Sequence, residues 1–233
     1  MSLKDVFVNI AIATKGNVPY KEECPIDYVG TVTVNSNMNL SFDFWFEDTL
    51  RVKQKNVLGR IPSSNDDIIA IVLESPHKNE YKNVSFIHPA LKTTGSNLQS
   101  KFEDVVSHFK NDLVGGKTYH VYLINAIPFQ CSLNEATHKY RTKIFKYVWD
   151  NGGEASFKRT LKDYHPSIIY NLCTVGKKTA ICKSLRKLVD NAIHASGMNS
   201  SPKVHSGAHP SSWSNKNNRS GYFYIDCQAF KRI

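Results

Sequence analysis

Short, continuously apolar segments alternate with amphipathic segments along the middle and the end of the chain. Apolar runs of this kind are typical of strands in a parallel sheet that is covered on both faces. We expect strands at residues 68–73, 119–125, 167–172 and 203–206. Between them, helical spacing of apolar positions predicts helices at residues 96–111, 134–149, 154–164 and 177–195. The pattern predicts an α/β fold, namely a three-layer α/β/α sandwich with a central, mainly parallel four-stranded sheet.

The first 65 residues follow a different pattern. Residues 28–34 and 40–46 alternate apolar and polar positions on either side of Asn35-Ser36-Asn37, which predicts a β-hairpin. We therefore expect residues 1–65 to form a β-rich N-terminal extension, a separate layer packed on a core domain of residues 66–233. The sequence does not indicate what this extension contacts.

Composition and charge narrow the class of partner. With 233 residues, 41% of them hydrophobic, the chain can bury one substantial core. Lys and Arg total 30 against 20 for Asp and Glu, so the formal net charge is +10. This excess favours a polyanionic partner, nucleic acid first, because each neutralised phosphate releases counterions. The alternative is a basic protein without such a partner, since net charge bears on solubility and association more than on fold.

Cysteine usage and hydropathy indicate a reducing, aqueous compartment. The five cysteines are odd in number and contain no Cys-x-x-Cys pair, so neither a disulfide framework nor a zinc or iron–sulfur site is indicated. The apolar run at residues 68–73 is too short for a bilayer, and residues 6–13 lack a basic leader and are interrupted by Asn9. We expect a cytoplasmic monomer with no export signal, membrane anchor, metal or cofactor.

Three polar side chains follow three of the expected strands. Glu74 comes directly after the first strand, Asn125 ends the second, and His209 follows the last. Ligands bind at the carboxyl ends of strands in sheets of this kind, so we expect one crevice to hold all three side chains. A proline breaks the chain shortly after Glu74 and again directly after His209, which predicts a polar loop at each place.

Glu74, Asn125 and His209 suit the hydrolysis of an N-glycosidic bond. That reaction builds positive charge on the sugar and negative charge on the departing base, so it needs a carboxylate near C1′ and a hydrogen-bond donor near the base. An asparagine amide can read the edge of a base that has left the stack. Each residue also has an ordinary interpretation, as a solvated carboxylate, a turn histidine or a loop amide. Their order along the chain favours the shared site.

The loops resemble the paired signature loops of the uracil-DNA glycosylase superfamily, over about residues 67–213. Its glutamate-bearing branches open the first loop with Gly-Glu-(Ala or Gln)-Pro-Gly and an acid three residues later, and residues 73–80 are similar in register. The resemblance implies that Glu74 organises the attacking water or stabilises the oxocarbenium-like sugar, with Glu80 in support. It also implies that Asn125 binds the pyrimidine and that His209 hydrogen-bonds the base as it leaves.

The closing loop of the family is His-Pro-Ser-(Pro or Ser)-Leu, in which the leucine wedges into the minor groove. Trp213 stands at the leucine position and is large enough to fill the gap left by a flipped nucleotide. The alternative is an ordinary packed tryptophan. Residues expected to contact DNA are Ser75, Pro76, Ser211, Ser212, Trp213, Lys203, Lys216 and Arg219.

The chain departs from the family at several positions. Leu73 and His77 stand where the family has glycines, and no cysteine reproduces the iron–sulfur spacing. Ala90 replaces a phenylalanine that stacks on uracil, which forfeits about 1–3 kcal/mol of stacking and opens volume. Phe86 and His77 are the candidates for an aromatic ring that stacks on the base in place of that phenylalanine. The resemblance with these departures implies a pocket for uracil or for a bulkier pyrimidine, such as a hydroxymethylated or glucosylated base of modified phage DNA.

Three functions follow from this reading. The first is a monofunctional DNA glycosylase that leaves an abasic site, because no lysine nucleophile adjoins the motifs. The second is a catalytically silent module that binds modified or damaged DNA. The third is a hydrolase of free nucleosides, which needs neither a basic surface nor Trp213. Repair of cellular DNA and defence against phage require the same core chemistry, so the setting stays open.

Overall fold

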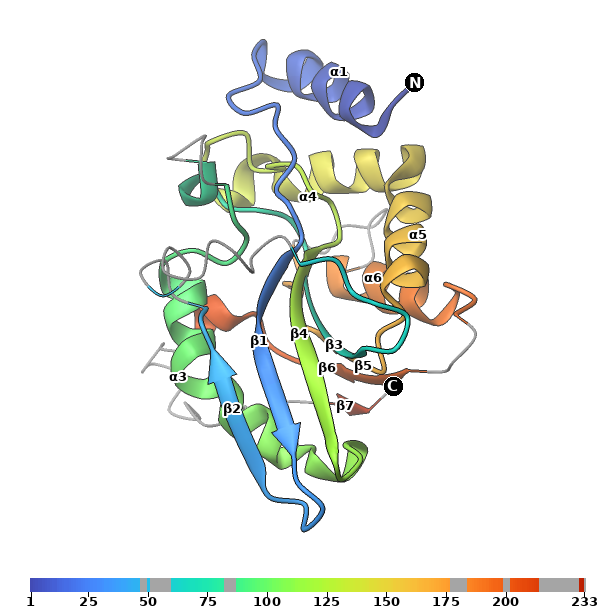
Figure 1. Ribbon diagram of the computed structural model, residues 1–233. Helices are drawn as coiled ribbons and strands as arrows, with labels where there is room; N and C mark the ends of the chain where they lie inside the picture. Colours follow the sequence, from blue (N-terminus) through green and yellow to red (C-terminus); the bar gives the residue numbers. More distant parts are fainter. Residues whose placement is uncertain are drawn as a thin grey trace.

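One mixed sheet organises the chain (Figure 1). The computed structural model describes residues 1–46, 50, 60–81, 87–176, 184–198, 202–213 and 231–232. Within these residues the sheet has seven strands in the order β2-β1-β4-β3-β5-β6-β7. The strands are β1 (Asp27–Val34), β2 (Leu40–Phe44), β3 (Asp67–Leu73), β4 (Lys117–Asn125), β5 (Ile168–Asn171), β6 (Lys203–Ser206) and β7 (Lys231–Arg232).

The four strands expected from the apolar runs form the centre of the sheet. β4, β3, β5 and β6 are neighbours in that order, and each pair is parallel. Six of the seven residues of β3 are buried, as a strand covered on both faces requires. The expectation of a four-stranded sheet is wrong, because β1, β2 and β7 extend it with antiparallel pairs.

The predicted N-terminal hairpin is present, but it is not a separate layer. β1 pairs with β2 on one side and with β4 on the other, so the hairpin continues the main sheet. The burial of Val29, Val32 and Val34 explains this position, since they join the same apolar cluster as Ile69 and Ile71 of β3.

Gly30 allows β1 to change register between its two neighbours. It lies at an irregularity in the pairing with β4 and has a φ of +136°. A Cβ at this position would lie 2.1 Å from the carbonyl oxygen of Asp43 on β2. We expect Gly30→Ala to lower the free energy of unfolding by about 1–3 kcal/mol, because its Cβ would collide with the β2 backbone in addition to the strain of a positive φ. Urea denaturation measures this loss. Gly16, which also has a positive φ but open space around its Cβ position, is the control, and an equal loss in both variants would contradict the steric explanation.

Five α-helices and four short helical turns are described. The helix predicted at residues 154–164 is confirmed at both ends, and those predicted at 96–111 and 134–149 are present with shifted ends. Residues 177–183 of the last predicted helix lie outside the described residues. The elements are α1 (Leu3–Lys15), α3 (Thr93–His108), α4 (Thr137–Val148), α5 (Glu154–Tyr164), α6 (Leu185–His194), η1 (Lys78–Tyr81), η2 (Lys110–Asp112), η3 (Trp149–Gly153) and η4 (Pro210–Ser212).

The helix α1 was not expected in a β-rich extension. Ser2 caps it by accepting a hydrogen bond from the backbone N–H of Asp5, and the Asp5 carboxylate accepts one from the N–H of Ser2. The residue types of this capping box are a sequence signal for the start of a helix. Apolar residues at helical spacing follow it, and Val6, Phe7 and Ala11 among them are buried. The β-rich expectation is therefore wrong for residues 3–15.

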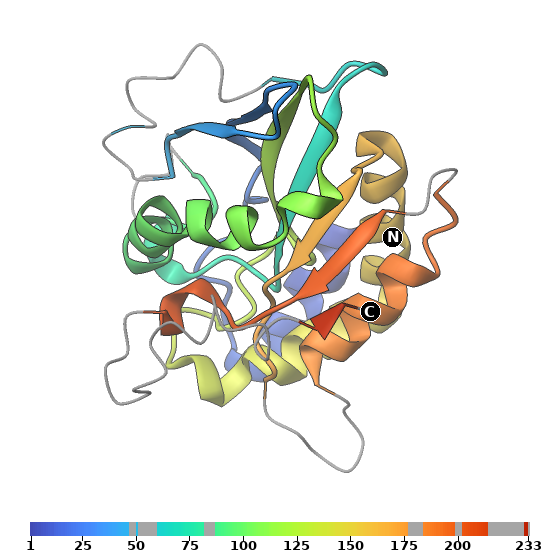
Figure 2. The ribbon, with the colours of Figure 1, turned by 90° about the horizontal axis from the view of Figure 1, so that it is seen from below.

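Helices lie on both faces of the sheet (Figure 2). Ala70 and Val72 of β3 pack with buried residues of α1, α4, α5 and α6, whereas Ile69 and Ile71 pack with α3. The chain leaves β3 for α3 on one face and leaves β5 towards α6 on the other. β3 and β5 are neighbours, so their carboxyl ends define a topological switch point, where open α/β sheets bind ligands. Among the helices of the described residues, none has the length and apolar character needed to cross a bilayer.

Candidate functional site

A cavity of about 400 Å³ lies at the switch point. Its wall includes residues from the loop after β3, the first turn of α3, the start of α4, and the loops after β5 and β6. Both loops singled out in the sequence therefore meet at one cavity. The predicted residues that line it are Glu74, Ser75, Pro76, His77, Glu80, His209 and Ser211.

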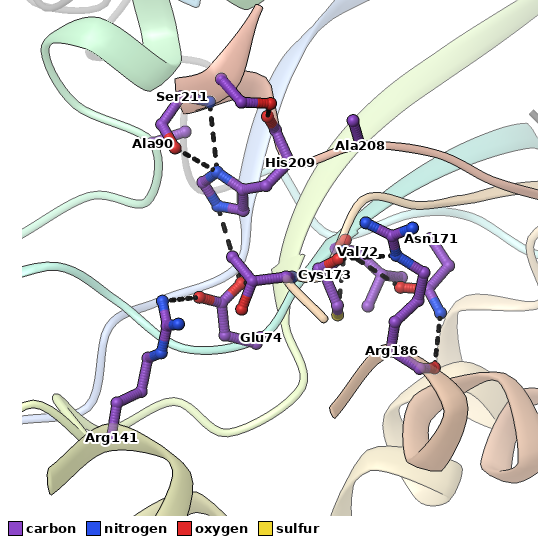
Figure 3. A network of polar contacts seen from close by, with 12 residues as sticks. Val72, Glu74, Ala90, Arg141, Asn171, Cys173, Arg186, Ala208, His209 and Ser211 are labelled. Carbon is purple, nitrogen blue, oxygen red and sulfur yellow. Dashed lines mark hydrogen bonds and ion pairs between the residues drawn. The ribbon is translucent and has the colours of Figure 1, made fainter. Parts of the chain in front are cut away.

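Glu74 is the centre of the polar contacts in this cavity (Figure 3). Its side chain is almost fully buried, yet its Oε1 accepts a 3.0 Å hydrogen bond from Arg141 Nη1 and its Oε2 accepts a 3.2 Å bond from the backbone N–H of Thr174. The Nε2 atom of His209 lies 3.6 Å from the same Oε2. A buried carboxylate needs such donors, because removal from water disfavours an uncompensated charge.

Arg141 and Thr174 were missed by the sequence argument. Arg141 lies on α4 one turn after Thr137, and both side chains line the cavity. That i, i+4 spacing was the only sequence signal, and it is common on ordinary helices. Thr174 contributes a backbone N–H after β5, and a pattern of side chains in the sequence cannot predict such a contact.

A buried network holds Thr174 in place behind Glu74. Asn171 donates from Nδ2 to the Asp190 carboxylate at 2.6 Å and accepts from the N–H of Cys173 at 3.1 Å. Ser206 donates to the same Asp190 oxygen at 2.6 Å, which ties β6 to this network. Arg186 Nε donates to the carbonyl of Cys173 at 2.9 Å. The loop that carries the Thr174 donor is therefore fixed to α6 and β6.

His209 has a defined tautomer. Its Nδ1 accepts a 3.1 Å hydrogen bond from the N–H of Ser211, so Nδ1 is unprotonated and the neutral ring carries its proton on Nε2, the atom nearest Glu74. Burial lowers the pKa of His209, and the nearby Glu74 carboxylate opposes that effect. His209 is therefore a neutral ring with one N–H to donate at neutral pH.

We expect the His209 ring to titrate below pH 6.5, and Glu74→Gln to move that midpoint lower still. The Glu74 charge raises the pKa of His209, so its removal leaves burial and the charge of Arg141 to act unopposed. Because the folded pKa lies below the unfolded value, this histidine lowers stability as pH falls from 6.5 towards its folded pKa. NMR titration of the ring checks this, with His209→Asn assigning the resonance. A midpoint that rises in Glu74→Gln would contradict the described geometry.

Glu80 lines the cavity and also holds the loop before α3 through a hydrogen bond. It is buried, and its Oε1 accepts a 3.0 Å hydrogen bond from the N–H of Ala90. Ala90 has a φ of +58° and belongs to the core cluster that covers the α3 face of the sheet. The expectation that Ala90 lines the base pocket is wrong, because this left-handed turn directs the chain so that Leu91 and Lys92 form the wall.

Asn125 does not share the cavity of Glu74 and His209. It lines a second cavity of about 400 Å³, together with Cys24 and Tyr164 among others. Both polar atoms of its side chain are buried without a hydrogen-bond partner among the described residues. The segment before β1 lies against the loop after β4, where the N–H of Cys24 donates to the carbonyl of Pro128 at 2.8 Å. Two of the three expected groups therefore meet, and the third does not.

Several residues expected to contact DNA lie elsewhere. Trp213 is 1% exposed, packs in the core and donates from Nε1 to the carbonyl of Ala208 at 3.0 Å, so the wedge interpretation is wrong and the packed alternative holds. Lys203 begins β6 and pairs with Ile168, which pairs with Ile69. It lies at the amino edge of the sheet, about 16 Å along the strand direction from Glu74. Ser212 donates to the carbonyl of His209 and closes the turn. Phe86, Lys216 and Arg219 lie outside the described residues.

Among the described residues, no three or more His, Cys, Asp and Glu side chains form a group that could hold a metal ion. Burial raises the pKa of the Cys131 thiol to about 12 and also raises that of Cys173, so neither is a thiolate nucleophile at neutral pH.

No protein-family model matches the chain, and no curated protein sequence matches it.

Proposed function

We propose that the protein is a monofunctional DNA glycosylase that hydrolyses the N-glycosidic bond of a flipped-out pyrimidine. The observation that carries the proposal is the Glu74–His209 pair, 3.6 Å apart at a cavity of about 400 Å³ at the switch point. The proposed enzyme is a cytoplasmic monomer with a three-layer α/β/α architecture, and DNA is its partner. The net charge of +10 supports a polyanionic partner.

The two side chains suit opposite ends of the breaking bond. The Glu74 carboxylate stabilises positive charge at C1′ and orients the attacking water. Water adds to C1′ as the C1′–N bond breaks, and the electron pair of that bond leaves with the base. The proton that the water loses neutralises the base anion, so the products are a C1′ hydroxyl and the free base. The Nε2–H of His209 donates a hydrogen bond to the base oxygen on which negative charge develops. Arg141 and the N–H of Thr174 hold the carboxylate during this step.

The wall of the cavity favours a pyrimidine bulkier than uracil. Among its described residues there is no Phe, Tyr or Trp, and His77 and His209 supply the aromatic rings. His77 is therefore the candidate stacking surface for the base. The volume lies within the usual range of ligand pockets, about 300–1,000 Å³, and leaves room for a substituent on the pyrimidine ring.

The test is base release from oligonucleotides that each carry one uracil, hydroxymethylated or glucosylated pyrimidine. We expect free base and strand breaks that appear only after alkali treatment, with a preference for a substituted pyrimidine. Release of uracil alone would reject the bulkier substrate. Binding without release from any oligonucleotide would favour a silent module. Strand breaks before alkali would assign a lyase step to Lys92, which lines the cavity.

Hydrolysis of free nucleosides is the second candidate, and the burial of Trp213 favours it. An enzyme that extrudes a base from a duplex offsets the lost stacking with an inserted apolar side chain, and Trp213 is not exposed for that purpose. A nucleoside hydrolase needs no such side chain. Turnover of mononucleosides faster than release from oligonucleotides would select this candidate.

A further inference from the structure

Three polar atoms in the wall of the Glu74 cavity are buried without a partner. The Oγ of Ser132, the Oγ1 of Thr174 and the Nε of Arg141 form no hydrogen bond with any of the described residues. All three residues line the cavity, and Ser132 is only 3% exposed. A buried polar group without a partner destabilises the folded state, so these atoms need a ligand or a water molecule in the cavity.

The three residues come together around the ion pair of Glu74 and Arg141. Arg141 Nη1 donates to one carboxylate oxygen at 3.0 Å, and the N–H of Thr174 donates to the other at 3.2 Å. Cys131, the residue before Ser132, lies close enough to Glu74 and Arg141 for both charges to affect the pKa of its thiol. We call Ser132, Thr174 and the Nε of Arg141 the Ser132 subsite.

The charges at the Ser132 subsite favour a neutral ligand. The Arg141 guanidinium is balanced by the Glu74 carboxylate, so a buried anion or cation would meet a like charge and bring no partner of its own. Arg141 Nε only donates, whereas each hydroxyl of the subsite both donates and accepts. An alcohol group suits this set, because its oxygen accepts from Nε–H and its proton goes to a hydroxyl oxygen. An alkyl group would leave all three atoms without a partner.

We propose that the Ser132 subsite binds an alcohol group of the substrate next to the bond that breaks. The proposal rests on the proposed function for the placement of a nucleoside at Glu74. Such a nucleoside carries an alcohol near C1′ either on the 2′-carbon of ribose or on a hydroxymethyl substituent of the pyrimidine. Arg141 and His209 approach Glu74 from different sides (Figure 3), so an alcohol at the subsite leaves the N–H of His209 for the base oxygen.

The test is titration calorimetry of the full chain with two pairs of compounds that have no hydrolysable glycosidic bond. 5-Hydroxymethyluracil is compared with 5-ethyluracil, whose substituent has the same size. Pseudouridine is compared with 2′-deoxypseudouridine, since both hold the base through a carbon–carbon bond. We expect the alcohol member of at least one pair to bind about tenfold more tightly, as one or two added hydrogen bonds predict. A preference in the first pair assigns the alcohol to the base, and one in the second assigns it to the sugar.

The variant Ser132→Ala is expected to reduce this preference by about 3–5-fold through the loss of one hydrogen bond. Its affinity for the member without the alcohol is expected to stay unchanged, because that compound makes no use of the hydroxyl. The control is Thr14→Val, which removes another buried hydroxyl that has no partner in the described part of the chain. Thr14 lies on α1, away from the cavity wall, so this variant is expected to keep the full preference. Urea denaturation compares the stability of the two variants.

Wild-type binding without a preference in either pair, or no binding of any compound, would overturn the proposal and leave ordered water as the partner of these atoms. Equal weakening of both members of a pair in Ser132→Ala, or the same loss of preference in Thr14→Val, would also overturn it, since a purely structural role predicts those results. The readout needs no base release. The expected preference without turnover would reject only the proposed reaction, whereas base release without the preference would reject only the subsite.

Discussion

Replacing Glu74 by glutamine is expected to slow base release by about 10²–10³-fold. Glutamine keeps the size of the side chain but removes the negative charge that faces C1′ in the proposed reaction. The contacts with Arg141 and Thr174 show how closely this carboxylate is positioned, since both donors reach it within 3.2 Å. Single-turnover release of the preferred base from an oligonucleotide measures the effect.

A matched variant separates the local charge from the overall charge. Glu103→Gln removes one exposed carboxylate from α3 and is expected to leave the rate unchanged. DNA affinity is expected to be retained in both variants, because the substitution at Glu74 removes a negative group. Near-normal release in Glu74→Gln, with the fold intact, would show that this carboxylate only organises the loop and would remove the basis of the proposed function.

Replacing Trp213 by alanine is expected to lower the free energy of unfolding by about 3–5 kcal/mol. The side chain is 1% exposed and packs in the cluster that covers the α3 face of the sheet. Its removal leaves a cavity and deletes the Nε1 hydrogen bond to the carbonyl of Ala208, which fixes the loop that carries His209. Urea denaturation followed by circular dichroism measures the loss.

The two interpretations of Trp213 predict different results for a conservative change. Trp213→Phe keeps a large apolar ring, so a core role predicts a smaller loss of stability than Trp213→Ala. A wedge role predicts unchanged stability in both variants and a loss of base release confined to duplex substrates. That second pattern would contradict the packing described for this residue.

The sequence predicted the centre of the sheet because buried parallel strands leave continuous apolar runs. β3 and β4 begin within two residues of their expected positions and end as expected, and α5 has the expected bounds. The alternation of apolar and polar positions in β1 predicted a strand with one buried face, but such alternation does not identify the neighbouring strand. The pairing of β1 with β4 depends on tertiary contacts, so the expected separate layer was wrong.

Position after a strand end predicted part of the site correctly and part of it wrongly. Glu74 and His209 stand after strands whose carboxyl ends face one edge of the sheet, and they meet as expected. Asn125 satisfies the same rule, yet the segment before β1 lies against its loop and forms a different cavity there. The role of Arg141 depends on the orientation of α4 over the sheet, which no local pattern encodes.

Apart from Arg141 of α4, the polar groups at Glu74 come from three different connections. They are its own loop after β3, the loop of Thr174 after β5 and the loop of His209 after β6. None of these three residues belongs to the apolar clusters on either face of the sheet. Selection can therefore alter one connection at a time and retune chemical preference while the scaffold keeps its stability. A lineage built on this architecture can diversify quickly in what it recognises, and its members would then share strand order long after their loop sequences have ceased to look alike.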